Sequence, residues 1–133
     1  MTPSEGAPVN VEIVSFGYLH AAPPAAHLTL DLRSHFRDPH VSPELRYLTA
    51  EDEPVRHAVL ATPGIVPLIT ATLLAVDAFA AGPGGGDLVI AMGCQGGRHR
   101  AATVARTLSL LLTGGGHTVT LHHRDLHKAV VNR

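Results

Sequence analysis

The sequence contains little cysteine and little charge. Its single cysteine, Cys94, excludes an internal disulfide and any metal site built from several cysteines. A lone cysteine suits a reducing compartment, and the N-terminal residues have neither the basic nor the apolar region of a secretion signal, so we expect a cytoplasmic protein. Charged residues make up 16% of the chain and its net charge is −1, which excludes a polybasic domain that holds nucleic acid by bulk electrostatics.

The sequence also lacks a hydrophobic run long enough to span a membrane. Residues 65–81 are the most apolar stretch, but they include Pro67 and Asp77 and fall short of the roughly 20 residues that a span requires. We expect a buried helix there and no membrane partner. The 133 residues, 45% of them hydrophobic, suit one domain, so we expect a flexible tail over residues 1–10 and a single domain over residues 11–133.

Hydrophobic patterns predict a fold of the α/β class, with a small, mostly parallel open sheet and helices on both faces. Strands are predicted at residues 11–16, 27–32, 87–92 and 118–121. Helices are predicted from the capping box at Thr49 and Asp52 to about residue 60, and at 65–80, 100–113 and 124–131. The polar stretch 33–50 is predicted to be a long ordered loop of the kind that carries function, with prolines flanking His40.

A glycine-rich turn joins the most apolar predicted strand to the next helix. The turn is Gly93-Cys94-Gln95-Gly96-Gly97-Arg98-His99-Arg100. A buried strand that runs through glycines into a helix directs several backbone N–H groups at one point, where the helix dipole also favours negative charge. Arg100 falls in the first helical turn, where its guanidinium could pair with a phosphate or carboxylate. The turn therefore predicts an anion site. It matches neither the Walker A nor the GxGxxG pattern, so ATP binding has no basis here and we expect no cofactor.

The same turn supports a second hypothesis. Cys94 and Arg100 fit the C-x5-R spacing of cysteine-dependent phosphatases, in which a thiolate attacks phosphorus. Those enzymes usually have His before the cysteine and Ser or Thr after the arginine, whereas this chain has Gly93 and Ala101. We therefore lean against an enzyme and treat Cys94 first as a small residue that ends a buried strand.

Several motifs in order along the chain resemble the C-terminal domain of the RNase adapter RapZ family. The segments that carry the resemblance are Ser15-Phe16-Gly17-Tyr18, Asp31-Leu32-Arg33, Asp38-Pro39-His40, Pro43-Glu44-Leu45-Arg46-Tyr47-Leu48-Thr49, Asp52-Glu53-Pro54-Val55, Gly93-Cys94-x-Gly96-Gly97-x-His99-Arg100 and His123-Arg124-Asp125-Leu126. They span roughly residues 11–128. Gln95, Ala101 and Val41 depart from the family pattern, which has Thr, Ser and an aromatic residue at these positions.

The resemblance implies that the domain binds a phosphorylated small molecule such as an amino-sugar phosphate, and that it acts in regulation. It places the ligand at the glycine-rich turn, and the predicted binding residues are His40, Gln95, Gly96, Gly97, Arg98, His99 and Arg100. Arg33, Arg46 and Arg124 are secondary candidates, and Arg33 and Arg46 are as plausible on the surface as in the pocket. The resemblance also implies homo-oligomers, RNA contacts and a P-loop NTPase, which would here be a separate protein.

Histidines near the C-terminal end suggest two further possibilities. His122 and His123 fall on opposite faces of a predicted strand, and no acidic-plus-histidine spacing accompanies them, so we predict no metal site. With His117, His127, Arg124 and Lys128 they form a modest basic surface that could meet RNA, although a solvated C-terminal face is at least as plausible. A purely RNA-binding scaffold without a small ligand stays open as a third hypothesis.

Overall fold

The computed structural model describes residues 8–133. Most of the predicted tail, residues 1–7, lies outside the described residues. The last residue of the predicted tail, Asn10, is already the first residue of the first strand.

Within the described residues, four parallel strands form one sheet in the order β2-β3-β1-β4. The strands are β1 (Asn10–Gly17), β2 (Leu28–Asp31), β3 (Leu88–Cys94) and β4 (Thr118–His123). The two central strands, β1 and β3, are the most buried, and the long apolar run of β3 reflects its place between two neighbours. The predicted open parallel sheet is confirmed.

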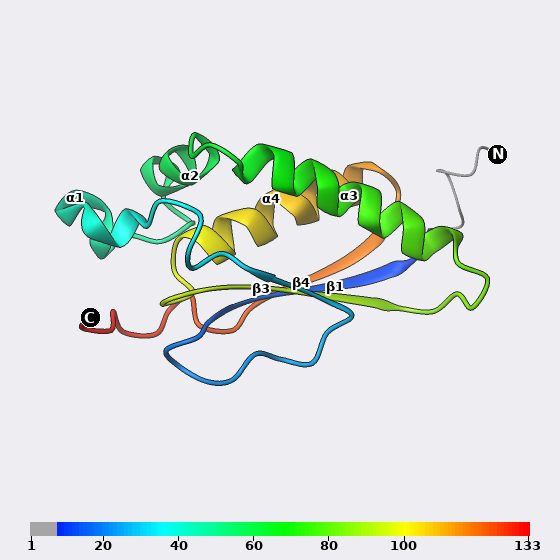
Figure 1. The fold of residues 1–133 in the computed structure, drawn as a ribbon, viewed down its shortest axis with the longest axis horizontal. Coiled ribbons are helices and arrows are strands. Elements are labelled where there is room, and N and C mark those ends of the chain that lie inside the picture. Colours follow the sequence, from blue (N-terminus) through cyan, green and yellow to red (C-terminus); the bar gives the residue numbers. More distant parts are fainter. Residues whose placement is uncertain (1–7) are drawn as a thin grey trace.

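Three longer helices pack on one face of this sheet (Figure 1). They are α2 (Glu53–Leu60), α3 (Ile65–Ala81) and α4 (Arg100–Gly114). The core between helices and sheet includes Ile13 of β1, Ile90 and Met92 of β3, and Leu108 of α4. The predicted loop 33–50 contains a short 3-10 helix, η2 (Pro39–Val41), and a single helical turn, α1 (Pro43–Arg46).

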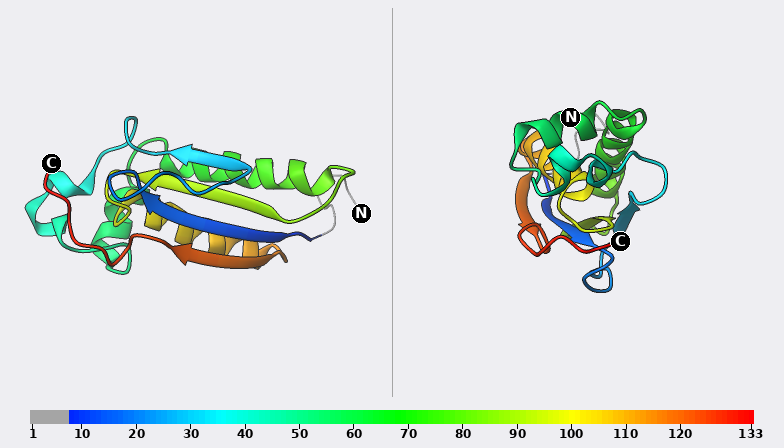
Figure 2. Two further views of the ribbon diagram at one scale, coloured as in Figure 1. Left: turned by 90° about the horizontal axis from the view of Figure 1, so that it is seen from below. Right: turned by 90° about the vertical axis from the view of Figure 1, so that its left-hand side faces the viewer.

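The other face of the sheet is crossed by the segment of residues 18–27 rather than by a helix (Figures 1 and 2). The prediction of helices on both faces is wrong in this respect. Pro23 and Pro24 prevent a regular helix in this connection. Its position fits a right-handed crossover. The connection from β1 to β2 runs across the sheet in one direction, whereas the connections from β2 to β3 and from β3 to β4 run in the other direction, so a right-handed β1–β2 connection lies on the opposite face.

This arrangement creates a topological switch point between β1 and β3. The chain leaves the end of β1 towards one face of the sheet and the end of β3 towards the other (Figure 1). Open α/β sheets bind their ligands in the crevice beyond such a point, at the carboxyl ends of the strands. The glycine-rich turn lies there, since it directly follows β3.

The predicted helix at residues 124–131 is not formed. Turns extend to about residue 128 and residues 129–133 have no regular secondary structure. Asp125 anchors the turns: its buried carboxylate accepts hydrogen bonds from the Gly17 N–H (2.7 Å) and from Arg124 (3.0 Å), and pairs with Lys128 (2.6 Å). These tertiary contacts hold the segment in turns.

Between residues 8 and 133, no single helix is both long and apolar enough to cross a membrane. Only α2 and α3 taken together meet the criteria of length and composition, and they are bent by 83° with respect to each other.

Candidate functional site

The glycine-rich turn is fixed by close backbone packing against the end of β1. Gly97 has a φ of +77°, and a Cβ atom there would lie 2.8 Å from the backbone nitrogen of Gly17. A Cβ atom at Gly17 would in turn lie 2.4 Å from the carbonyl carbon of Gly96. Gly96 differs, because among the described residues no heavy atom beyond its chain neighbours lies within 4 Å of an added Cβ. Gly17 and Gly97 therefore serve packing, and Gly96 leaves open space.

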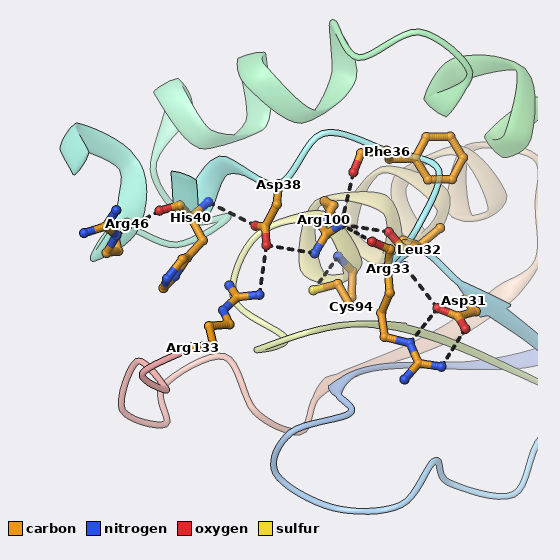
Figure 3. A network of polar contacts seen from close by, with 11 residues as sticks. Asp31, Leu32, Arg33, Phe36, Asp38, His40, Arg46, Cys94, Arg100 and Arg133 are labelled. Atoms are coloured by element: carbon orange, nitrogen blue, oxygen red, sulfur yellow. Dashed lines mark hydrogen bonds and ion pairs between the residues drawn. The ribbon is translucent and has the colours of Figure 1, made fainter. Parts of the chain in front are cut away.

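Arg100 is completely buried and holds the segment that follows β2 (Figure 3). Its Nη1 donates hydrogen bonds to the carbonyl oxygens of Leu32 (3.0 Å), Arg33 (3.0 Å) and Phe36 (3.1 Å). Its Nη2 forms an ion pair with Oδ2 of Asp38 at 3.1 Å. The guanidinium thus ties the first turn of α4 to residues 32–38.

A small inner hollow lies above the turn. Its walls are formed by Asp38, His40, Cys94, Gly96, Arg98, His99, Arg100, Val130, Val131 and Arg133. The cavity measures about 10 Å³, which is at the lower limit for a single water molecule. The hollow brings most of the predicted binding residues together, and Val130, Val131 and Arg133 form part of its wall.

Several hydrogen-bond donors around the inner hollow have no acceptor. Among the described residues, the backbone N–H groups of residues 95–100 donate no hydrogen bond. The buried Nε of Arg100 and the buried Nε of Arg98 also lack a partner within this part of the chain. Buried donors are rarely left unpaired in native proteins, so we expect a bound group with acceptor atoms at this cluster of donors. The N-terminal end of α4 adds its partial positive charge.

A larger outer hollow of about 380 Å³ adjoins the inner one. It is lined by His40, Val41, Arg46, Tyr47, Val130, Asn132 and Arg133. His40, Val130 and Arg133 belong to the walls of both hollows. Arg46 uses its Nε to donate to the His40 carbonyl oxygen at 2.8 Å, and within residues 8–133 its terminal nitrogens have no hydrogen-bond partner.

The structure does not bring all predicted site residues together. Arg33 pairs with Asp31 and lies 3.6 Å from the ring centre of Tyr18, outside both hollows. Arg124 donates to the carbonyl oxygens of Ala21 and Ala22, so it clamps the segment that crosses the second face. Gln95 follows the strand but lines neither hollow.

Arg98 and His99 reach into the inner hollow while binding the backbone of residues 47–48. The Arg98 guanidinium donates to the carbonyl oxygens of Tyr47 (2.7 Å) and Lys128 (2.8 Å). The His99 ring contacts the Leu48 carbonyl oxygen at 2.9 Å. Burial lowers the pKa of His99, although the hydrogen bond to Leu48 and the charge of Asp38 oppose this change. The pKa of His40 is lowered too, by burial and then by the charge of Arg133.

Two residues of this site were missed by the sequence analysis. Asp38 binds Arg100 and Arg133 through one oxygen and accepts the His40 N–H through the other. An Asp directly before Pro39 is a typical N-cap of a helical turn, and this pattern could have identified Asp38 from the sequence. Arg133 carries no such signal, because only the folded chain brings it to Asp38.

The thiol of Cys94 is buried at the base of the inner hollow. The Ala101 N–H lies 3.5 Å from its sulfur. Asp38, Val130 and Val131 line the same hollow as Cys94. Across residues 8–133, no group of three or more His, Cys, Asp or Glu side chains is arranged to hold a metal ion.

Comparison with known proteins relates the chain to one family. The family described as the RapZ C-terminal domain matches residues 9–127. A nucleotide-binding protein of Thermobifida fusca is 38% identical over 121 residues, which cover 89% of this chain and 41% of that protein. Nucleotide-binding proteins of Frankia casuarinae and Limosilactobacillus reuteri are 39% and 34% identical, over 89% and 94% of this chain. The chain spans about two fifths of the length of these relatives.

Proposed function

The chain belongs to the RapZ C-terminal domain family, and on that premise we propose that it is a regulatory domain that binds a phosphorylated small molecule at the glycine-rich turn. The ligand class that the family resemblance implies is a sugar phosphate, with an amino-sugar phosphate as the first candidate. The domain binds this ligand without turning it over.

The unpaired donors at the turn are the observation that carries the proposal. A phosphate offers several acceptor oxygens, and the backbone N–H groups of residues 95–100 with the Nε of Arg100 supply donors on one side of it. A helix N-terminus preceded by glycines is a common setting for phosphate, since partial charge and donors act in the same direction. The open space above Gly96 permits close approach.

The outer hollow suits the remainder of such a ligand. Arg46 gives it a positive charge, and His40 and Tyr47 add polar groups for hydroxyls. Its volume of about 380 Å³ lies within the range of small-molecule sites. Asp38 in the wall of the inner hollow is paired with Arg100, and Arg98 and Arg46 add positive charge to the two hollows.

A single methyl group tests the site without disturbing the fold. Gly96→Ala adds a Cβ that meets no described neighbour within 4 Å and lies where the anion approaches. We expect calorimetric affinity for glucosamine 6-phosphate to fall at least tenfold, while the melting temperature stays close to that of the parent. Gly114→Ala is the matched control, since it also adds a methyl group to open space but at the far end of α4. Equal affinities in Gly96→Ala, Gly114→Ala and the parent would reject the turn as the site.

Regulation requires that the bound state alter contact with a partner. We propose that ligand occupancy changes binding to RNA, to a P-loop NTPase or to further copies of the chain. The exposed residues His122 and Lys128 offer the RNA surface, and an RNA contact made there weakens as salt increases. Sedimentation and RNA-binding measurements with and without glucosamine 6-phosphate test these partners, and identical results in both conditions would contradict a signalling role.

A further inference from the structure

We propose that residues 129–133 are a displaceable cover over the glycine-rich turn, which competes with the ligand for the inner hollow. This inference rests on the proposed function for the identity of the competing ligand. The presence of the cover itself can be tested without any ligand.

The contacts of this segment place it directly over the predicted site. Val130 and Val131 form part of the wall of the inner hollow, together with Gly96. The Arg133 guanidinium lies 2.8 Å from Oδ2 of Asp38, the same oxygen that Arg100 binds (Figure 3). With the segment in place, the hollow has room for about one water molecule, so a phosphate cannot reach the backbone N–H groups.

The segment is held by few interactions. It has no regular secondary structure, and the last backbone hydrogen bond before it is donated by the Lys128 N–H to Asp125. For residues 129–133 themselves, the only polar contact to other described residues is the Arg133–Asp38 pair. When Arg133 leaves, Asp38 keeps Arg100 as its ion-pair partner, so no unpaired buried charge remains on Asp38 and the cost of releasing the segment is limited.

The rest of the site does not depend on the cover. Asp38 keeps its ion pair with Arg100 when Arg133 leaves, and Arg98 keeps its acceptors at Tyr47 and Lys128. Departure of residues 129–133 therefore exposes the turn without dismantling it. Ligand binding and release of the segment become coupled, because both cannot occupy the same space.

Cys94 provides a readout that needs no ligand. It is the chain's single cysteine, it is buried, and it lines the inner hollow together with Val130 and Val131. We would measure its alkylation by iodoacetamide in the parent, in a chain ending after Lys128, and in Arg133→Ala. Arg106→Ala, an exposed arginine of α4 outside both hollows, is the control. Thermal unfolding of each variant checks the fold.

We expect alkylation to become at least fivefold faster in the shortened chain, to increase in Arg133→Ala, and to remain unchanged in Arg106→Ala. Affinity for inorganic phosphate and glucosamine 6-phosphate should increase severalfold in the first two variants. Unchanged alkylation in the folded shortened chain would overturn the cover. Weaker phosphate binding in that chain would also overturn the proposal, since it would make Arg133 a ligand-binding group. Faster alkylation with no phosphate binding in any variant would support the cover and reject the proposed function instead.

Discussion

Arg100 and Asp38 meet in an ion pair of 3.1 Å at the point where the first turn of α4 touches the segment after β2. The arginine side chain is 2% exposed and the aspartate side chain 20%. Arg100 therefore has a structural role in addition to the proposed binding role. Beside the ion pair, its Nη1 donates hydrogen bonds to three carbonyl oxygens of residues 32–36. Loss of Arg100 should therefore affect both stability and binding.

Replacing Arg100 by Ala should lower the free energy of unfolding by about 3 kcal/mol or more, because it breaks a buried ion pair and leaves three carbonyl oxygens without their donor. Phosphosugar affinity should fall more than tenfold as well. Urea denaturation and calorimetry measure the two effects. Arg100→Lys keeps the charge but not the planar fork, so its stability should lie between those of Ala and the parent.

The control for this prediction is His117→Ala, at the opposite end of α4 from the turn, which should leave phosphosugar affinity nearly unchanged. An Arg100→Ala protein with the parent's stability would show that the network of residues 32–38 is not held by this guanidinium.

Replacing Gly97 by Ala should destabilise the fold by about 2 kcal/mol or more. The residue has a φ of +77°, which costs a non-glycine residue about 1–2 kcal/mol, and its new Cβ would lie 2.8 Å from the Gly17 nitrogen. Chemical denaturation of Gly97→Ala beside Gly96→Ala separates the two glycines. Similar stabilities for both variants would contradict the packing role of Gly97.

Stability should fall as the pH decreases below about 6.5. Burial keeps the pKa of His99 below its usual value, so the unfolded chain binds a proton before the folded one does. The contribution of neutral His99 to the free energy of unfolding is fully present above the pKa of histidine in the unfolded chain, about 6.5. It is lost as the pH falls towards the lower pKa of His99 in the folded protein. Urea denaturation at several pH values between 7 and 5 measures the slope.

His99→Gln should flatten this dependence, since its amide can still donate to the Leu48 carbonyl oxygen but does not titrate. The exposed His57 of α2 supplies the matched control, His57→Gln, whose pH profile should follow that of the parent. If both variants keep the parent's slope, His99 is not its source.

The protein should release no phosphate from aryl phosphates, and Cys94→Ser should bind phosphosugar within a few-fold of the parent. A catalytic thiol needs a stabilised thiolate and an open line of attack, whereas Cys94 is buried and faces the same hollow as the Asp38 carboxylate. Steady-state phosphate release is the measurement. Turnover that Cys94→Ser abolishes and Gln95→Ala retains would favour a phosphatase.

The order of the elements could be predicted because it depends on local patterns. The apolar run of β3, the glycines that follow it and the helical spacing from Arg100 onwards are each visible within a few residues. Prediction failed at residues 124–131, where helical spacing was overridden by the contacts of Asp125 with Gly17 and Lys128. The contact with Gly17 joins distant parts of the chain, and hydrophobic periodicity within a short segment cannot predict such contacts.

The sequence by itself determined the buried strand, the glycine-rich turn after it and the helix that begins at Arg100, because short-range sterics and hydrophobic periodicity are sufficient for these. Only the tertiary structure decided what the turn faces. Asp38 reaches Arg100 because the crossover after β2 passes over the end of β3, and Val130, Val131 and Arg133 line the hollow at the turn because Asp125 anchors the chain just before them. Which charges become buried partners depends on where long connections return, and this is set by the packing of the whole sheet and its helices.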